Sequence, residues 1–247
     1  MNRYLKLPLD KTKRHFIVGD IHGKYKGLLR LLYEAGYEEK KGDIVYTVGD
    51  QLDRGWKSME VIRFFQEENR YTIMGNHEAM AIDPKWFDVW LNNDGDTGIH
   101  SIREHGMDSV DFIPMFQDLP YLIDVGEDGD SDAFRIVHAE VPVIWGEELL
   151  MKRLEDGDEA ILDHLIWSRQ SMTAATHLMP EELLKWAKIR KKANPRRVFC
   201  GHTPIPGNPQ FVGNQLFLDT GYKSLTCVEA MSGAITTIQM EGDEIRG

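Results

Sequence analysis

The sequence predicts an α/β protein with strands at its centre and helices packed outside. Short apolar runs rich in Val, Ile and Phe alternate with stretches of helical periodicity through the first third of the chain. The runs at 15–18 and 44–48 are each followed by a glycine, which lets the backbone turn sharply where a strand stops. The resulting order of strand, helix, strand, helix and strand favours parallel strands covered by helices.

The first elements follow one another closely along the chain. The strand at 15–18 leads into a leucine-rich helix around 28–32, and the strand at 44–48 leads into a second helix around 61–65. A third strand is expected at 71–74, immediately before a GNHE sequence. These segments form the predicted parallel unit.

The remaining two thirds of the chain mix helices and short strands. A tryptophan-bearing stretch at 84–106 is predicted to be helical with a break at 92–95, and the segments 121–125 and 133–137 flank an acidic turn and predict a hairpin. Further helices are expected at 146–155, 159–167 and 180–192, and short strands at 198–200, 216–218, 225–230 and 235–240. No long internal repeat or low-complexity linker interrupts the pattern, so we expect one domain over residues 1–247.

Composition and charge narrow the possible partners. Apolar residues make up 42% and charged residues 28% of the 247 residues, which is an ordinary globular balance. The 29 lysines and arginines against 40 acidic residues give a formal net charge of −11. Because such a surface repels nucleic-acid backbone and anionic lipid, neither a nucleic acid nor a membrane is expected as a partner.

The termini and the cysteines point to a reducing compartment. Residues 1–10 lack the apolar core of a signal peptide, and no apolar stretch approaches the length of a membrane span. Cys200 and Cys227 lie in strand-like apolar runs and are expected to be buried free thiols. We therefore expect a cytoplasmic location.

Side chains that bind metals follow the apolar runs. Four runs end in glycine and then such a side chain: IVGD at 17–20, TVGD at 47–50, IMGN at 73–76 and FCGH at 199–202. A fifth run ends directly in a histidine, and another histidine lies two residues after the first aspartate, on the same face of an extended backbone. We expect the strands to deliver these side chains to one shared sheet edge. The predicted metal ligands are Asp20, His22, Asp50, Asn76, His138 and His202.

This set of ligands fits two divalent cations. A carboxylate between two cations can serve both, and Asp50, which has ligands on both sides of it in the sequence, is the predicted bridge. Carboxylate and imidazole ligands without thiolate select Mn²⁺, Fe²⁺ or Zn²⁺. Two such cations roughly 3.5–4 Å apart would activate a shared water and hold a phosphoryl oxygen for in-line attack.

Three further residues would complete a site for phosphate chemistry. Arg54, four residues after Asp50, supplies a planar fork that can pair two phosphate oxygens. His77 lies next to a predicted ligand, and Asp53 is a carboxylate that would orient it and raise its pKa. His77 is therefore the predicted acid that protonates the leaving alkoxide. The alternative for His77 is a purely structural partner of Asp53.

Together these motifs resemble a known family of enzymes. GDIHG at 19–23, GDQLDRG at 49–55, GNHE at 75–78, His138 and GHTP at 201–204 are similar, in matching order, to the phosphoprotein phosphatase branch of the calcineurin-like metallophosphoesterases, above all to its short bacterial and phage members. The resemblance implies a four-layer α/β/β/α metallophosphoesterase sandwich with mixed sheets. It also implies two metals, commonly Mn²⁺, and hydrolysis of phosphomonoesters by a metal-bound water without a phosphoenzyme.

The resemblance also implies roles for individual residues. One metal would be held by Asp20, His22 and Asp50, and the other by Asp50, Asn76, His138 and His202. Arg54 and, through the IWSRQ segment at 166–170, Arg169 would grip the phosphate, although a surface ion pair is the alternative for Arg169. Leu52 replaces the usual valine, and Glu140 stands where long eukaryotic enzymes have glycine, as in the bacterial forms. Nothing corresponds to the C-terminal regulatory segments of the eukaryotic enzymes, so no regulatory subunit is implied.

Three functions are open at this point. The leading one is a metal-dependent serine/threonine protein phosphatase, with phosphotyrosine as a further ester, whose substrate is a phosphoprotein or phosphopeptide. A rival is a symmetrical dinucleoside tetraphosphate hydrolase, whose members share GDIHG and GNH loops but carry a small residue in place of Asp53 and GNHD in place of GNHE. A third is a metal-bound binding module without catalysis. The joint presence of Asp53, Arg54 and His77 argues against it, because a scaffold needs only the ligands.

The other histidines and the tryptophans are expected to have structural roles. His15, His100, His105, His164 and His177 lack the spacing of metal ligands. The tryptophans expected to pack in the core or at the rim of the cleft are Trp86, Trp90 and Trp145.

Overall fold

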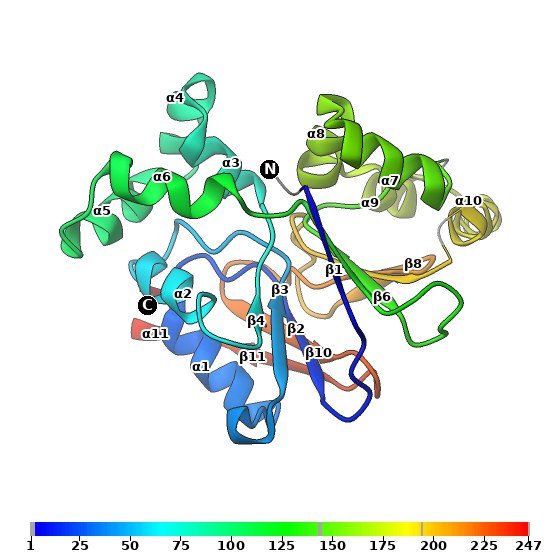
Figure 1. Cartoon of the computed structure of the whole chain (residues 1–247), viewed down its shortest axis with the longest axis horizontal. Coiled ribbons are helices and arrows are strands. Elements are labelled where there is room, and N and C mark those ends of the chain that lie inside the picture. Colours follow the sequence, from blue (N-terminus) through cyan, green and yellow to red (C-terminus); the bar gives the residue numbers. More distant parts are fainter. Residues whose placement is uncertain (1–2, 143–144, 194, 247) are drawn as a thin grey trace.

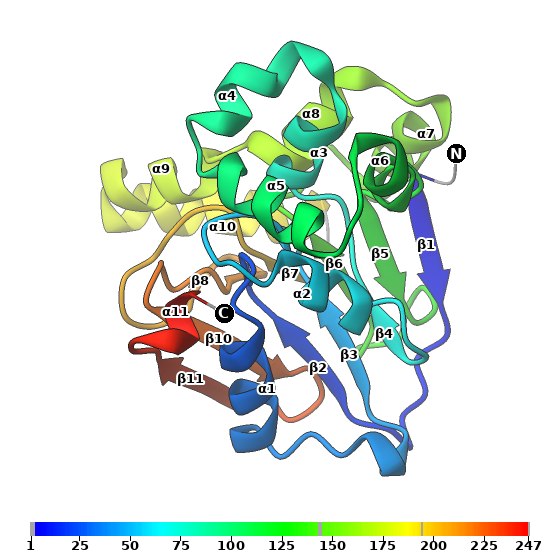
Figure 2. The same ribbon diagram turned by 90° about the vertical axis from the view of Figure 1, so that its left-hand side faces the viewer.

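Two β-sheets pack face to face, and helices cover both outer sides (Figures 1 and 2). The computed structural model describes residues 3–142, 145–193 and 195–246. Both sheets contain parallel and antiparallel pairs. This arrangement confirms the α/β/β/α fold with mixed sheets that was expected from the sequence.

The first sheet contains the predicted parallel unit. Its strands are β2 (His15–Val18), β3 (Ile44–Thr47), β4 (Arg70–Tyr71), β10 (Ser224–Glu229) and β11 (Ile235–Gln239). They lie in the order β11-β10-β2-β3-β4. β2, β3 and β4 are parallel, as predicted, whereas β10 runs antiparallel to both β2 and β11.

The second sheet is built around the predicted hairpin. Its strands are β1 (Tyr4–Leu7), β5 (Leu122–Val125), β6 (Phe134–Val137), β7 (Arg197–Cys200), β8 (Gln210–Val212) and β9 (Gln215–Phe217). They lie in the order β1-β5-β6-β7-β9-β8. β5 and β6 pair antiparallel, which confirms the hairpin, and β7 is parallel to both of its neighbours, β6 and β9.

The helices form three groups. Those on the outer face of the first sheet are α1 (Tyr25–Glu34), α2 (Ser58–Phe64) and the C-terminal α11 (Asp243–Arg246). A second group follows β4 and consists of α3 (Asn76–Ile82), α4 (Phe87–Leu91), α5 (Gly95–Glu104) and α6 (Ser109–Gln117). The third group covers the second sheet and consists of α7 (Glu147–Asp156), α8 (Glu159–Trp167), α9 (Gln170–His177) and α10 (Pro180–Ala193). Short 3₁₀ turns lie at Glu39–Lys41 and Pro84–Trp86.

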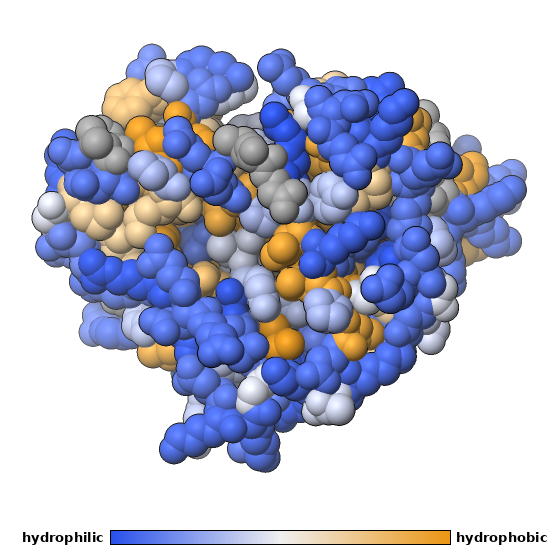
Figure 3. Space-filling model, viewed as in Figure 1, coloured by the Kyte–Doolittle hydropathy of each residue, from blue (hydrophilic) through white to orange (hydrophobic). Residues whose placement is uncertain are grey.

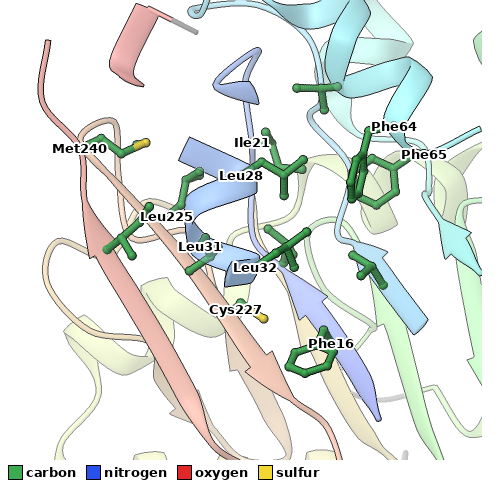
Figure 4. Close-up of a cluster of buried hydrophobic side chains, with 14 residues drawn as sticks. Phe16, Ile21, Leu28, Leu31, Leu32, Phe64, Phe65, Leu225, Cys227 and Met240 are labelled. Atoms are coloured by element: carbon green, nitrogen blue, oxygen red, sulfur yellow. The ribbon is translucent and has the colours of Figure 1, made fainter. Parts of the chain in front are cut away.

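Apolar side chains fill the spaces between the layers. On α1, Leu28, Leu31 and Leu32 recur at helical spacing, and they pack on Phe16 of β2 and Leu225 of β10 (Figure 4). A separate cluster between the sheets joins residues of β2 and β3 to residues of β5, β6, β7 and β9. Cys200 and Cys227 are buried and free, as expected. The strands that carry the predicted ligands are therefore held from both sides.

Several elements differ from the sequence-based expectation. The third strand ends at Tyr71 instead of residue 74, because the backbone N–H of Met74 donates to the carbonyl of Pro120 (2.8 Å) and leaves the β3 ladder. Strands β1 and β8 and helices α3, α6, α9 and α11 were not predicted. β1 is fixed by its parallel pairing with β5, far away in the sequence, and α6 contains Pro114, a residue that usually breaks a helix.

Hydrophilic residues cover most of the face shown in Figure 3, and apolar residues gather in its middle and upper left. This agrees with the composition, in which charged residues make up 28% of the chain. Within the described ranges, no helix combines the length and the apolar character needed to cross a bilayer.

Candidate active site

The six predicted metal ligands lie together, and they come from both sheets. Each is buried, with at most 6% of the residue exposed: Asp20, His22, Asp50, Asn76, His138 and His202. Four of them come after β2, β3 and β4 of the first sheet, and the other two, His138 and His202, come after β6 and β7 of the second. The expectation of one shared sheet edge is therefore wrong. The ligands meet where the ends of two facing sheets approach each other, because β6 and β7 pair only within the second sheet.

Asp50 lies at the centre of this cluster. Its Oδ2 is 3.6 Å from Nε2 of His22, and its Oδ1 is 3.5 Å from Nε2 of His138. The potential ligand atoms fall into two groups that share Asp50, one with His22 and His77 and one with Asp20 and His138, and within each group the atoms lie within 4.8 Å of one another. A carboxylate shared by two groups has the geometry expected of a bridging ligand.

Asn76 and His202 close the second group. Oδ1 of Asn76 is 2.8 Å from Nε2 of His138 and 2.8 Å from Nδ1 of His202. The backbone N–H of His202 donates to both carboxylate oxygens of Asp20, at 3.2 and 3.0 Å. These hydrogen bonds connect the loop after β7 to the loop after β2.

Backbone carbonyls fix the orientation of two histidines. Nδ1 of His22 donates to the carbonyl of Leu52 (2.8 Å), and Nδ1 of His138 donates to the carbonyl of Val48 (2.8 Å). Burial lowers the pKa of both imidazoles, so each is neutral and presents an Nε2 lone pair toward Asp50. Burial and the neighbouring His138 also lower the pKa of His202, to about 3. Neutral, oriented imidazoles are what a metal ion requires of histidine.

The backbone at the site is held in an unusual conformation. Five site residues have φ in the left-handed region, between 49° and 70°: His22, Asp50, Asp53, Arg54 and His202. Each such residue costs about 1–3 kcal/mol relative to ordinary backbone, and such costs cluster where a side chain must be aimed precisely. The loops after β2, β3 and β7 therefore store strain that directs their side chains to one point.

At two of the motif glycines a side chain would collide with a neighbouring carboxylate, although the backbone conformation there does not itself require glycine. A Cβ on Gly201 would lie 1.8 Å from Oδ1 of Asp20, and a Cβ on Gly75 would lie 2.2 Å from Oδ1 of Asp50. Neither glycine has a positive φ. The glycine before the ligand is thus needed at these positions because a carboxylate from a neighbouring loop packs against its backbone.

Glu78 joins the GD loop after β3 to the start of α3, a role that the sequence analysis missed. Its buried carboxylate accepts the backbone N–H groups of Asp50 (2.9 Å), Gln51 (2.7 Å), Leu52 (3.2 Å) and Gly75 (3.0 Å). Burial and the charge of Asp50 raise the pKa of Glu78 to about 7. The only signal in the sequence is the fourth letter of GNHE, which does not indicate what the side chain contacts.

The predicted acid and its carboxylate are in contact. Nδ1 of His77 is 2.6 Å from Oδ2 of Asp53, and both residues are buried. Burial by itself would lower the pKa of His77, but the charges of Asp50 and Asp53 raise it above its usual value. Arg54 lies beside this pair, with Nη2 3.4 Å from Nε2 of His77 and Nη1 2.7 Å from Nε2 of His22. The structure thus brings Asp53, Arg54 and His77 to the cluster of ligands.

Trp90 is a further residue of the site that the sequence analysis assigned only to packing. It is buried among the side chains of α5 and α6, and its Nε1–H donates to Oδ2 of Asp53 (2.7 Å), the same oxygen that contacts His77. Gly98 of α5 lies so close that a Cβ there would be 2.2 Å from Oδ1 of Asp53. The second helix group therefore holds the carboxylate that orients His77, and no spacing in the sequence indicates this contact.

We expect Trp90→Phe to lower kcat by about 10-fold while leaving the metal content unchanged, because partners that orient catalytic groups have effects of this size. Phenylalanine keeps an aromatic ring in the core but removes the donor that Asp53 uses. Steady-state kinetics and metal analysis check the prediction. Trp145→Phe, the same change at a half-buried tryptophan that packs on Arg153, is the control. Equal kinetics of Trp90→Phe and the unmodified protein would contradict the assigned contact.

Arg169 also lies at the site. Its Nε is 3.3 Å from Nε2 of His202, and its side chain is exposed at the N-terminus of α9. Among the described residues, no carboxylate lies within ion-pair distance of its guanidinium. The position beside a predicted ligand favours a role toward substrate over the alternative of a surface ion pair.

Comparison with known proteins agrees with this geometry. Residues 14–207 match the family model described as Calcineurin-like phosphoesterase. The chain belongs to this family. The match includes the six predicted ligands as well as Asp53, Arg54, His77 and Arg169.

Individual relatives of this calcineurin-like phosphoesterase differ in their named activity. The chain is 27% identical over 224 residues to serine/threonine-protein phosphatase 2 of Escherichia coli K12, covering 89% of this chain and 92% of the relative. It is 35% identical over 69 residues to a symmetrical bis(5'-nucleosyl)-tetraphosphatase of Buchnera aphidicola, covering 27% of this chain and 24% of that protein. A solved protein serine/threonine phosphatase from Saccharomyces cerevisiae is 16% identical with a TM-score of 0.65, covering 97% of this chain and 84% of that one, and shows the shared fold.

The donors of this calcineurin-like phosphoesterase fit the divalent metals that its family implies. Two carboxylates, an amide oxygen and three neutral imidazoles converge without any thiolate: Asp20, Asp50, Asn76, His22, His138 and His202. Burial would raise the pKa of Asp50, but His77, whose own pKa is raised, lies 4.0 Å from its Oδ2 and donates its backbone N–H to Oδ1 (3.1 Å), and so helps to hold the pKa of Asp50 below its usual range. A charged carboxylate among neutral imidazoles suits hard or borderline cations.

Proposed function

We propose that this calcineurin-like phosphoesterase is a metal-dependent phosphomonoesterase that acts as a serine/threonine protein phosphatase, with phosphotyrosine as a further ester. The observation that carries the proposal is the single cluster around Asp50, which brings six potential ligands, two guanidinium groups and the His77–Asp53 pair together. Metal-assisted hydrolysis of a phosphate ester uses these three kinds of group in one place: ligands for the metal ions, cations that bind the phosphate, and an acid for the leaving group. Its substrate would be a phosphoprotein or phosphopeptide.

Each predicted ligand has a proposed place. Asp20, which the distances group with Asp50 and His138, would join His22 and Asp50 at one cation, as the family resemblance implies, and Asp50, Asn76, His138 and His202 would hold the other. We propose Mn²⁺ as the ion, with Fe²⁺ or Zn²⁺ as substitutes that the same donors accept. Bound in this way, the two cations would supply an activated water for in-line attack and polarise a phosphoryl oxygen.

The chain's own residues would do the rest of the chemistry. Arg54 and Arg169 reach the ligand cluster from two different loops, after β3 and after α8, beside His22 and His202, and would bind phosphoryl oxygens there. Asp53 holds Nδ1 of His77 and so leaves Nε2 directed toward Asp50 and Arg54. From that position His77 would give its Nε2 proton to the oxygen of the leaving alcohol.

The dinucleoside tetraphosphate hydrolase is the alternative function. A relative named for that activity matches 27% of this chain, whereas a relative named as a protein phosphatase matches 89%. A solved structure titled for the tetraphosphatase activity covers 98% of this chain with a TM-score of 0.66, but at 19% identity it shows the shared fold alone. In addition, Asp53 and Glu78, which the alternative class replaces, both make buried contacts here, with His77 and with the loop after β3. These observations favour a protein phosphatase.

Turnover of three substrates by one preparation tests the proposal. The protein is loaded with Mn²⁺, Fe²⁺ or Zn²⁺ and given phosphoserine and phosphothreonine peptides, nitrophenyl phosphate or diadenosine tetraphosphate. We expect metal-dependent hydrolysis of the two monoester classes, with the larger kcat/KM for the peptides. A larger kcat/KM for diadenosine tetraphosphate would establish the alternative, and no hydrolysis of any ester would end the proposal.

We expect Arg54→Ala to lower kcat by about 10²–10³-fold, because charge pairing by a preorganised donor strengthens as the transition state forms. Arg30→Ala is the matched control, since Arg30 is a partly exposed arginine of α1 that pairs with Glu244 (2.7 Å) away from the site. Steady-state kinetics with nitrophenyl phosphate separate kcat from KM. A rise in KM alone would make Arg54 a substrate clamp without a role in the transition state.

A further inference from the structure

Glu140 is a fully buried carboxylate two residues after His138, and it accepts an unusual number of hydrogen bonds. Oε1 accepts from Oγ of Ser168 (2.5 Å) and from the backbone N–H of Gln170 (2.6 Å). Oε2 accepts from the backbone N–H (3.0 Å) and the hydroxyl of Ser171. Taking a carboxylate out of water is unfavourable unless donors of this kind replace the water.

These donors come from the residues on both sides of Arg169. Ser168 precedes it, and Gln170 and Ser171 are the first residues of α9. Among the described residues, Arg169 forms no hydrogen bond or ion pair with Glu140, and its Nε lies instead 3.3 Å from Nε2 of His202. Glu140 thus fixes the backbone that carries Arg169 and leaves the guanidinium facing the predicted metal site.

Arg190 of α10 forms an ion pair with Glu140 and balances its charge. Nη2 of Arg190 donates to Oε2 of Glu140 (3.1 Å) and to the carbonyl of Val141 (2.7 Å), and both charged residues are fully buried. Gln215 of β9 completes the support, because it accepts the N–H of Val141 (3.0 Å) and donates to Oγ of Ser171 (3.2 Å). The loop that carries His138 and the turn that carries Arg169 are therefore parts of one buried network.

We propose that Glu140 is a positioning residue that holds Arg169 where it can bind a phosphoryl oxygen next to His202. The inference rests on the proposed phosphatase function, because it assigns Arg169 to phosphate. The network makes the positions of Arg169 and His138 depend on each other, since one short loop contains both His138 and the carboxylate that anchors the Ser168–Ser171 turn. In this proposal Arg190 is the counter-ion of Glu140, and Arg169, not Arg190, binds the substrate.

Glu140→Gln is expected to weaken the binding of inorganic phosphate and to lower kcat/KM for nitrophenyl phosphate, each by about 10-fold. Glutamine keeps the shape of the side chain, but it replaces an acceptor oxygen with an NH₂ donor that faces other donors, and it leaves Arg190 without its counter-ion. Glu140→Asp, which keeps the charge on a shorter chain, is expected to recover part of the loss. Glu229→Gln is the control, because Glu229 accepts backbone N–H groups of Met231 (3.1 Å) and Ser232 (2.7 Å) at the β10–β11 turn.

A double-mutant cycle separates positioning from a merely structural role. If Glu140 acts through Arg169, then Glu140→Gln changes phosphate binding and kcat/KM less than 2-fold once Arg169→Ala is present, because the positioned group is already gone. Phosphate binding is measured by titration calorimetry on the Mn²⁺-loaded protein, so the cycle does not depend on turnover. Equal losses from Glu140→Gln in both backgrounds, or wild-type phosphate binding by Glu140→Gln, would overturn the inference.

The same experiment keeps the two proposals apart. A wild-type protein that hydrolyses no ester but binds phosphate with the coupled losses described would refute the phosphatase function and support the positioning role. If Glu140→Gln does not fold, Ser168→Ala and Ser171→Ala replace it in the cycle, because each removes one hydroxyl donor and keeps the Glu140–Arg190 pair. Losses from these variants that persist undiminished beside Arg169→Ala would overturn the inference.

Discussion

Asp50→Asn is expected to reduce kcat by about 10³-fold or more and to leave the purified protein with less than its full metal content. Asp50 contributes to both groups of potential ligands, so the loss of its charge weakens both cation positions at once. The fold is expected to survive, because asparagine tolerates the left-handed backbone at this position (φ 49°) and retains an oxygen that can accept the N–H of His77. Metal analysis and steady-state kinetics on the same preparation make the measurement.

Asp43→Asn is the matched control for this variant. Asp43 is also a buried aspartate, and it accepts from Arg14 and from the backbone N–H of Glu38 (2.8 Å), outside the ligand cluster. We expect it to lower thermal stability and to keep metal content and turnover. Normal turnover with normal metal content in Asp50→Asn would remove the assignment of Asp50 as a bridge, whatever the control shows.

His77→Asn is expected to keep both metals and to lower kcat by about 10²–10⁴-fold, the usual contribution of a general acid. The variant removes the Nε2 proton that would go to the leaving oxygen and leaves Asp53 bonded to Trp90. The loss is expected to be smaller for nitrophenyl phosphate than for a phosphoserine peptide. Nitrophenolate is a weaker base than an alkoxide, so its departure depends less on protonation by an acid. Comparison of kcat for the two substrates checks this reason for the effect.

Metal analysis of His77→Asn distinguishes two roles that the geometry brings close together. Potential ligand atoms of His77, His22 and Asp50 lie within 4.8 Å of one another, so a ligand role for His77 predicts the loss of one cation from the variant. The acid role predicts a full metal content. His15→Asn is the control, since His15 is a fully buried histidine on β2 that contacts Tyr46 (3.1 Å) and the carbonyl of Asp10 (3.1 Å).

Much of the fold could be read from local patterns. The strand at His15–Val18 and the helix at Glu159–Trp167 have the predicted bounds, because an apolar run before glycine and a helical periodicity are both properties of neighbouring residues. Of the predicted strand at 71–74 only Tyr71 lies in a strand, because Met74 bonds to Pro120, a residue far away in the sequence. β1 was missed for the same kind of reason, since its pairing partner is β5.

The sequence predicted a set of site residues that the structure brings together, but it did not predict several of the residues that support them. Glycine followed by a ligand is a pattern of adjacent residues, and it repeats often enough to indicate one site. Glu78, Trp90 and Glu140 act on the site through contacts that span 26 or more residues. No local spacing shows that the indole of Trp90 donates to Asp53, or that Glu140 anchors the turn around Arg169.

The sequence by itself determined which carboxylate, amide, imidazole and guanidinium side chains the proposed site can draw on, and which glycines precede them. Only the tertiary structure decided that the ligands come from the ends of two facing sheets, since strand pairing depends on contacts between distant segments. It also decided which buried carboxylates act as supports, because a carboxylate without water is stable only where folding brings enough donors to it. For Glu78 and Glu140, these donors are backbone N–H groups of other loops, and their positions exist only in the folded chain.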